Sequence, residues 1–276
     1  MPSIKDFKNT DVLRVLVYGR SGSGKTFGAG TFPRPVFMDF DKGIATLRNP
    51  QFVSQYGVRD IIYEQFTERS IAKGGVVSQH NAFDDAYTFY QSMMKPDKVD
   101  TFDTWVIDTA TSLSEIALNK ALIFMSGQKL SNTHATAMAQ GVVVPKLQDF
   151  GAERSLIEQF VAMVLGSGKN VVLLCHEKEL YEGDAVVGRV PLLTGKGVEA
   201  ICSQFDEVYN LQPLRKGPDL VRSLVTEQVG RNMAKSRLGI PSGTEWNWPT
   251  IKAQLDKITA AQVIHSTSAM AGAATR

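Results

Sequence analysis

Short apolar runs alternate with longer amphipathic segments along most of the chain. The short runs are rich in β-branched and aromatic residues, which is typical of strands buried on both faces of a parallel sheet. The longer segments place apolar residues three and four positions apart, as on one face of a helix. This alternation predicts an α/β fold with a mostly parallel central sheet flanked by helices.

The predicted elements follow one another without an internal repeat, as in one large domain. The predicted strands cover residues 12–18, 35–40, 60–66, 105–107, 170–175, 207–211 and 223–227. The predicted helices begin near residue 24 and then cover residues 81–94, 112–124, 152–165 and part of 246–255.

The pattern changes in the C-terminal third of the chain. A hairpin is predicted over residues 181–190, because Glu182-Gly183-Asp184 is a turn signal between two short alternating runs. Beyond Ile264 the sequence is STSAMAGAATR, which offers little for a core to bury. We therefore predict a single domain over residues 1–258 with a β-rich C-terminal extension, and a disordered tail over residues 259–276.

Composition narrows the class of protein. The 276 residues are 43% apolar, enough for a substantial core, and a net charge of +2 predicts no global basic field. Any surface for DNA is therefore expected to be local. Cys175 and Cys202 lie far apart without metal-like spacing, and no apolar run approaches the ~20 residues of a membrane span. We expect a reduced, cytoplasmic protein that does not enter a membrane.

One stretch, VLVYGRSGSGKTFGAGTF, carries specific chemistry. It fills the motif G-x-x-x-x-G-K-[ST], with a buried strand before it and a helix after it. Lys25 is expected to neutralise the β- and γ-phosphates, and the Thr26 hydroxyl to bind Mg²⁺. The motif thus predicts ATP and Mg²⁺ as cofactors. The expected nucleotide-binding residues are Gly19, Arg20, Ser21, Gly22, Ser23, Gly24, Lys25, Thr26 and Phe27.

A phosphate loop also needs an acidic partner for the metal, placed after a buried strand. The segment TWVIDT supplies Asp108 in that position, so Thr26 and Asp108 form the predicted metal pair. Asp103 is the alternative, but it precedes the apolar run instead of following it.

The order of the phosphate loop, MDFD, WVIDT, VVLLCHEKE and AKSRLGIPSG resembles that of RecA-fold ATPases. It is most similar to short phage-encoded RecA-like annealing and recombination ATPases, over roughly residues 12–249. The resemblance implies a RecA-like core. It also implies that Asp41 is the water-activating carboxylate, with Asp39 in support, because Thr109 stands where many P-loop ATPases carry glutamate. A solvated turn acid is the alternative for Asp41.

The resemblance also assigns the later motifs. His176, at the end of a buried strand, corresponds to a sensor of the γ-phosphate, although a purely structural histidine remains the alternative. Lys235 and Arg237, followed by Gly239, match the K-x-R-x-G pattern of residues that reach a neighbouring subunit's ATP. An arginine in that role stabilises charge on the transferring phosphoryl group. A homo-oligomer, ring or filament, is then required. A solvated basic loop is the alternative.

The resemblance places single-stranded DNA on the loops over residues 126–146 and 178–197. Basic groups near an aromatic residue suit a site that follows the DNA backbone. The expected DNA-binding residues are Lys129, Lys146, Lys178, Arg189 and Lys196. The leading hypothesis is an ATP-dependent phage recombinase or annealing protein acting on single-stranded DNA, with a single-strand-binding protein as a further partner. The alternatives are a helicase-like or packaging motor core, and a nucleotide-regulated assembly protein that does not bind DNA.

Overall fold

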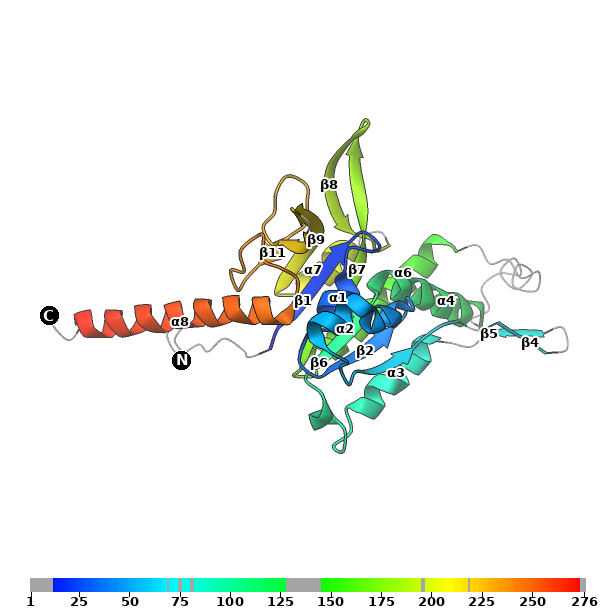
Figure 1. Cartoon of the computed structure of the whole chain (residues 1–276). Helices are drawn as coiled ribbons and strands as arrows, with labels where there is room; N and C mark the ends of the chain where they lie inside the picture. The colour runs from blue at the N-terminus through cyan, green and yellow to red at the C-terminus, as the bar shows by residue number, and fades with distance from the viewer. Residues whose placement is uncertain are drawn as a thin grey trace.

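The computed structural model describes residues 12–68, 70–73, 76–79, 82–127, 145–194, 197–217 and 219–273. Its centre is a sheet in which seven strands follow the order β10-β9-β1-β7-β6-β2-β3, with β11 paired to β9 and β8 to β7 (Figure 1). All pairings from β9 to β3 along this order are parallel, whereas β10, β11 and β8 add antiparallel pairs. The predicted α/β class with a mostly parallel sheet is confirmed.

The elements follow the predicted alternation closely. The strands are β1 Arg14–Gly19, β2 Pro35–Asp39, β3 Ile62–Gln65, β4 Ser70–Lys73, β5 Val76–Gln79, β6 Thr104–Asp108, β7 Asn170–Glu182, β8 Ala185–Pro191, β9 Glu207–Lys216, β10 Asp219–Val225 and β11 Lys235–Ser236. The helices are α1 Lys25–Ala29, α2 Pro50–Tyr56, α3 Ala82–Met93, α4 Ala110–Gly127, α6 Leu147–Leu165, α7 Gly197–Gln204 and α8 Trp248–Ala273, with 3-10 turns η2 Gly43–Arg48 and η3 Val99–Thr101.

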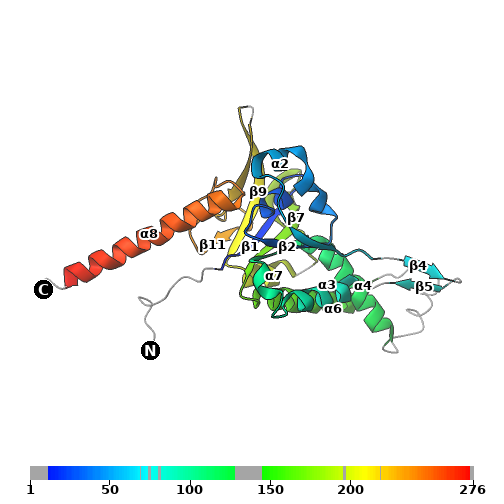
Figure 2. The same ribbon diagram turned by 60° about the horizontal axis from the view of Figure 1, so that its bottom comes forward.

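Helices cover both faces of the sheet (Figure 2). Alternation along β1 explains the two layers, because Leu16 and Tyr18 face one core while Val15 and Val17 face the other. The first core also receives buried side chains from α3, α4, α6 and α7, and the second receives them from α1, α2 and the start of α8. The central strands β2 and β6 are buried along their whole length, which is why they read as unbroken apolar runs.

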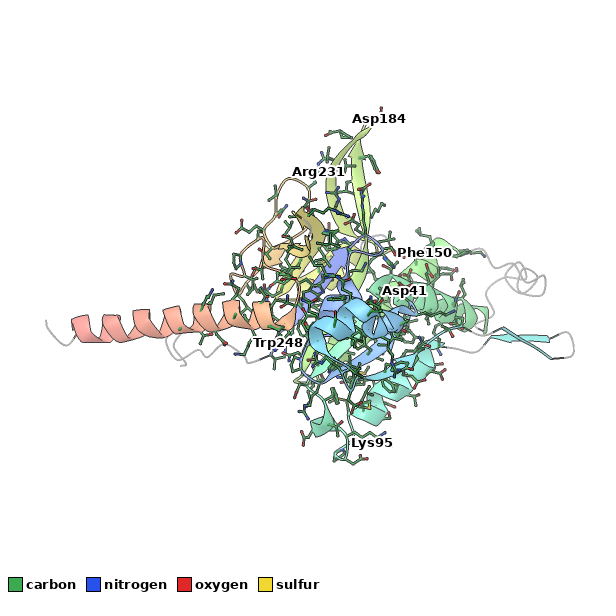
Figure 3. All side chains as sticks on the ribbon, in the orientation of Figure 1. Asp41, Lys95, Phe150, Asp184, Arg231 and Trp248 are labelled. Atoms are coloured by element: carbon green, nitrogen blue, oxygen red, sulfur yellow. The ribbon has the colours of Figure 1, made fainter. Side chains whose placement is uncertain are left out.

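The predicted hairpin is present, but its first strand is much longer than expected. β7 is buried over its first six residues and then continues beyond the sheet to Glu182. It returns as β8, and the tip at Asp184 projects away from the core (Figure 3). The loop that carries Arg231 packs against this hairpin, where the Met233 N–H donates to the Arg189 carbonyl at 3.0 Å.

The C-terminal segment differs from the expectation of a disordered tail over residues 259–276. α8 begins at Trp248, next to Pro249 in its first turn, and continues to Ala273. Small residues predicted a tail because they bury little, yet alanine has the highest helix propensity and no proline interrupts the run. Within the described residues, no helix is long and apolar enough to cross a membrane.

Candidate nucleotide site

Strand ends carrying polar residues converge at one edge of the sheet. Gly19, the last residue of β1, is level with His176 on β7. Asp39, the last residue of β2, is level with Asp108 on β6. Parallel strands end at the same edge of a sheet, so the structure gathers four positions that the sequence separates by up to 157 residues.

The phosphate loop connects β1 to α1 and points its lysine inward. Lys25 is only 6% exposed, and its Nζ donates to the carbonyl oxygens of Gly19 at 2.9 Å and Arg20 at 3.0 Å. Gly24 has a φ of 96°, a conformation that strains residues with a side chain. Ser23 Oγ is buried and has no hydrogen-bond partner within the described residues. A buried hydroxyl donor and a buried ammonium suit the phosphate oxygens of a nucleotide.

The predicted metal pair is in direct contact. Thr26 Oγ1 donates a hydrogen bond of 2.7 Å to Asp108 Oδ2. Burial raises the pKa of Asp108 to about 7, against the opposing effects of Thr26 and Lys25, whereas burial lowers the pKa of Lys25 itself. The alternative acid, Asp103, instead receives two hydrogen bonds of 2.6 and 2.7 Å from the Arg34 guanidinium. Asp108 is therefore the acid that belongs to the phosphate loop.

Sequence reasoning missed a glycine beside this pair. A methyl group on Gly43 would lie 3.0 Å from Asp108 Oδ2 and 3.3 Å from Thr26 Oγ1. Glycine therefore leaves room next to the two oxygens. Hydroxyl and carboxylate oxygens, together with nucleotide phosphates, are typical Mg²⁺ ligands, so these residues fit the predicted ion.

Replacement of Gly43 by alanine is expected to weaken magnesium binding while leaving the fold intact. The added methyl group crowds the metal pair, so the Mg²⁺ concentration for half-maximal ATPase activity should rise about 10-fold. Magnesium titrations of the ATPase rate and of nucleotide binding measure this. Gly151→Ala is the matched control, because a methyl group there meets no atom within 4 Å. An unchanged magnesium requirement in the Gly43 variant would place the ion elsewhere.

The predicted catalytic carboxylate and sensor are paired. Asp41 Oδ2 lies 3.2 Å from His176 Nε2, and Ser112 Oγ donates to Asp41 Oδ1 at 3.3 Å. Asp39 is fully buried and accepts hydrogen bonds from backbone N–H groups of the turn that carries Asp41. Gln65 Nε2 donates to Asp39 at 2.8 Å. Asp39 thus holds the turn in place, while Asp41, with 42% of its side chain exposed, faces solvent beside the phosphate loop.

A family model described as an AAA domain (AAA_24) matches residues 11–238. The chain belongs to this AAA domain family. It is a P-loop ATPase with a mostly parallel α/β core.

Two solved structures resemble this ATPase at low identity. It is 16% identical to the KaiC-like protein PH0186 from Pyrococcus horikoshii OT3, with 83% of this chain and 82% of that chain covered and a TM-score of 0.41. It is 11% identical to the flagellar accessory protein FlaH from Methanocaldococcus jannaschii, with 82% of each chain covered and a TM-score of 0.34. A search of curated proteins gave no significant match.

An ionic cluster that the sequence did not predict joins the phosphate loop of the ATPase to the β7–β8 hairpin. Arg20 Nε donates to Glu177 at 3.1 Å, and its Nη2 contacts Glu179. Arg189 lies 3.6 and 3.5 Å from the same two carboxylates, and the Tyr181 hydroxyl donates to Glu179 at 2.7 Å. A hollow of about 390 Å³ is lined by Arg20, Ser21, His176, Glu177, Glu179 and Tyr181.

The predicted finger residues lie away from the ATPase's own phosphate loop. Lys235 is on β11, which pairs with the first residues of β9 and is level with Val15 and Leu16, in the half of β1 away from Gly19. Burial is the main cause that lowers the pKa of Lys235. Arg237 has 63% of its side chain exposed, and its Nη1 lies 2.8 Å from Asp206. β11 therefore lies toward the end of the sheet opposite the phosphate loop.

The predicted DNA-binding residues are only partly described. Lys129 and Lys196 lie outside the described residues. Lys146 is exposed at the start of α6, and Lys178 is exposed on β7. Arg189 instead has carboxylate neighbours within its own hairpin. The described members therefore lie on separate elements.

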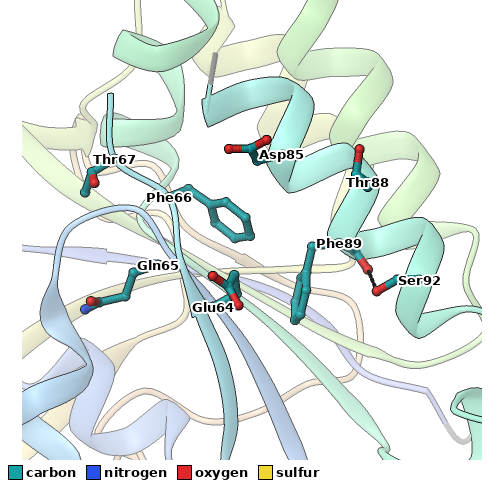
Figure 4. Close-up of a pocket in the computed structure, with 8 residues that line it drawn as sticks. All are labelled: Glu64, Gln65, Phe66, Thr67, Asp85, Thr88, Phe89 and Ser92. Carbon is teal, nitrogen blue, oxygen red and sulfur yellow. Dashed lines mark hydrogen bonds between the residues drawn. The ribbon is translucent and has the colours of Figure 1, made fainter. Parts of the chain in front are cut away.

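A second hollow of about 310 Å³ lies between β3 and α3 (Figure 4). The rings of Phe66 and Phe89 line it, with centroids 5.8 Å apart. Its other lining residues are Glu64, Gln65, Thr67, Asp85, Thr88 and Ser92. None of the predicted site residues lines this hollow.

Proposed function

We propose that this ATPase uses Mg²⁺ and ATP to control its binding to single-stranded DNA, and that it promotes annealing or strand exchange as an oligomer. The observation that carries this proposal is the continuity of β7. His176 contacts Asp41 beside the phosphate loop, and the same strand continues as the projecting hairpin. A change at the nucleotide therefore has a short mechanical path to a surface outside the core.

The groups of one chain would prepare the attack on ATP. Lys25 and the backbone of the phosphate loop bind the phosphates, and Thr26 with Asp108 holds the ion. Magnesium supplies charge neutralisation at the phosphate oxygens. Asp41 accepts the proton of the attacking water or orients it, and His176 and Ser112 fix the position of its carboxylate.

A second chain would complete the site. Lys235 lies toward the end of the sheet opposite Gly19, and Arg237 follows it with a largely exposed side chain. A planar, permanently charged guanidinium that reaches a neighbour's γ-phosphate stabilises the charge of the transferring group. The head-to-tail contact that this requires builds a ring or a filament.

Arg237→Ala is expected to retain ATP binding and to lose hydrolysis by about 1,000-fold, the usual effect of removing an arginine finger. Asp41→Ala should be inactive for a different reason, because it lacks the group beside the attacking water. A mixture of the two variants should recover part of the activity, since some interfaces then combine an intact Asp41 with an intact Arg237. Steady-state ATPase measurements at several mixing ratios check this. Asp206→Asn is the control, because it removes the acid partner of Arg237 but keeps the arginine.

The DNA proposal is tested by measuring ATPase activity with and without single-stranded DNA, together with a salt series of DNA binding. We expect DNA to stimulate the ATPase, and affinity to fall steeply with salt as neutralised phosphates release counterions. Lys178→Ala should reduce the salt slope by about one unit. An ATPase that binds no DNA even at low salt would refute this proposal and leave the nucleotide assignment unaffected.

A second candidate function follows from the charge of the hairpin. Between residues 177 and 190 there are four acidic and two basic residues, a net charge of −2. An acidic hairpin repels a DNA backbone and attracts a basic protein surface. A nucleotide-regulated assembly protein that does not bind DNA fits this observation. In that case the DNA experiment gives no binding, whereas ATP still changes the oligomeric state.

A further inference from the structure

An arginine outside the predicted site lies almost buried beside the phosphate loop. Arg222, on β10, is 8% exposed. Its side chain makes no ion pair within 4.0 Å and no hydrogen bond within the described part of the chain. Glu245 and Tyr56 act on its charge only at longer range. Its guanidinium nitrogens are not fully enclosed, so these N–H donors remain open to water or to the oxygen atoms of a ligand.

The position of Arg222 is fixed against the start of α1. Its Cζ lies 3.7 Å from the centre of the Phe27 ring, a close cation–π contact. A methyl group on Gly24 would lie 2.2 Å from Arg222 Nε, so the guanidinium rests directly on the loop backbone. Trp246 links the two segments. Its backbone N–H donates to the Arg222 carbonyl at 2.7 Å, and its indole N–H donates to the Lys25 carbonyl at 2.8 Å.

The electrostatics at this point favour an anion. Lys25, in the first turn of α1, is a second cation close to the loop backbone on which Arg222 rests. A phosphate group has the opposite charge to both residues and would accept hydrogen bonds from Arg222.

The sheet order indicates which phosphate this is. Asp108 on β6, His176 on β7 and Asp41 after β2 all lie on one side of β1, so we expect the γ-phosphate on that side. Arg222 lies on the opposite side of β1, two strands away on β10. The α-phosphate, which is attached to the ribose, is at the opposite end of the triphosphate from the γ-phosphate. We therefore expect it on the side of Arg222.

We propose that Arg222 is a binding residue for the ribose-side phosphate of the nucleotide, contributed in cis by β10. The proposal rests on nucleotide binding at the phosphate loop and is independent of DNA binding. Because ATP and ADP both carry this phosphate, Arg222 stays engaged after hydrolysis. Its contribution is therefore to hold the nucleotide, whereas the groups on the other side of β1 distinguish ATP from ADP.

The test compares nucleotide affinities of the full chain by titration with ATP, ADP and GTP. Arg222→Met should weaken all three about 10- to 100-fold, because one charge-assisted contact is lost. The ATP-to-ADP ratio should stay unchanged. Arg222→Lys keeps the charge and should recover part of the affinity. Arg154→Met, which removes an exposed arginine on α6, is the matched control and should bind normally.

Several outcomes would overturn the proposal. Unchanged affinities in Arg222→Met would show that the guanidinium only packs against Phe27. A loss confined to ATP would place Arg222 at the γ-phosphate, and a changed ATP-to-GTP ratio would place it at the base. If Arg222→Met does not fold, Arg222→Lys decides by the same affinities, since a purely structural role leaves them at wild-type values. If the wild-type protein binds no nucleotide, the phosphate-loop assignment itself is wrong. If the wild-type protein binds nucleotide and Arg222→Met binds it equally well, only the Arg222 proposal is wrong.

Discussion

Replacement of Lys25 by alanine is expected to lower the ATPase rate at least 100-fold and to weaken ATP binding severely, since removing one preorganised donor typically costs about that much. The ammonium group is nearly buried and is held by the two loop carbonyls, so its position is fixed before the nucleotide arrives. Its charge also opposes the rise in the pKa of Asp108. Loss of Lys25 therefore removes a phosphate ligand and raises the pKa of Asp108 further.

Fluorescent-nucleotide titration and steady-state ATPase measurements check the effect of Lys25→Ala. Lys25→Met should behave in the same way, because it keeps the length of the side chain and lacks the charge. Lys252→Ala is the control, since that lysine is half-exposed and pairs with Asp256 one turn along α8. Undiminished ATPase activity in a folded Lys25→Ala protein would show that the glycine-rich turn is not the nucleotide site.

The parts of this site that the sequence predicted are those with a local signature. An unbroken apolar run followed by a polar residue identifies both a buried parallel strand and its carboxyl end. Asp108, Asp41 and His176 each follow such a run, which is why their meeting at one edge could be expected. The order of their strands in the sheet could not be expected, because no local feature of the sequence indicates that β7 lies between β1 and β6.

The parts that were missed depend on contacts between distant segments. Arg222 meets Gly24 and Phe27 across about 200 residues, and its sequence context is that of an ordinary alternating strand. The two glutamates that hold Arg20 follow His176 as part of a charged run, which favoured a loop. That run instead continues β7, because the hairpin partner β8 satisfies its backbone. Pairing with a distant partner overrides local composition there.

Asp108→Asn is expected to abolish magnesium-dependent hydrolysis and, at the same time, to stabilise the nucleotide-free protein. Asp108 is almost completely buried, and burial raises its pKa to about 7, so ionisation at higher pH costs stability. Three pKa units correspond to about 4 kcal/mol, and asparagine avoids that cost while it still accepts the Thr26 hydrogen bond. A gain of about 2–4 kcal/mol raises Tm by about 5 °C or more in a domain of this size.

The pH dependence distinguishes this explanation from better packing of the amide. In the unfolded chain Asp108 loses its proton near pH 4, whereas in the folded protein it keeps the proton up to about pH 7. The unfolded state therefore binds fewer protons in this window, and wild-type stability falls as pH rises from 4 to 7. The stability advantage of Asp108→Asn should be absent near pH 4 and complete above pH 7.

Thermal unfolding in a metal chelator across this pH range measures the stability advantage of Asp108→Asn, with the exposed Asp97→Asn as control. A constant advantage at every pH would mean that the carboxylate of Asp108 is not strained by burial, and that its role as a poised metal ligand has to be reconsidered.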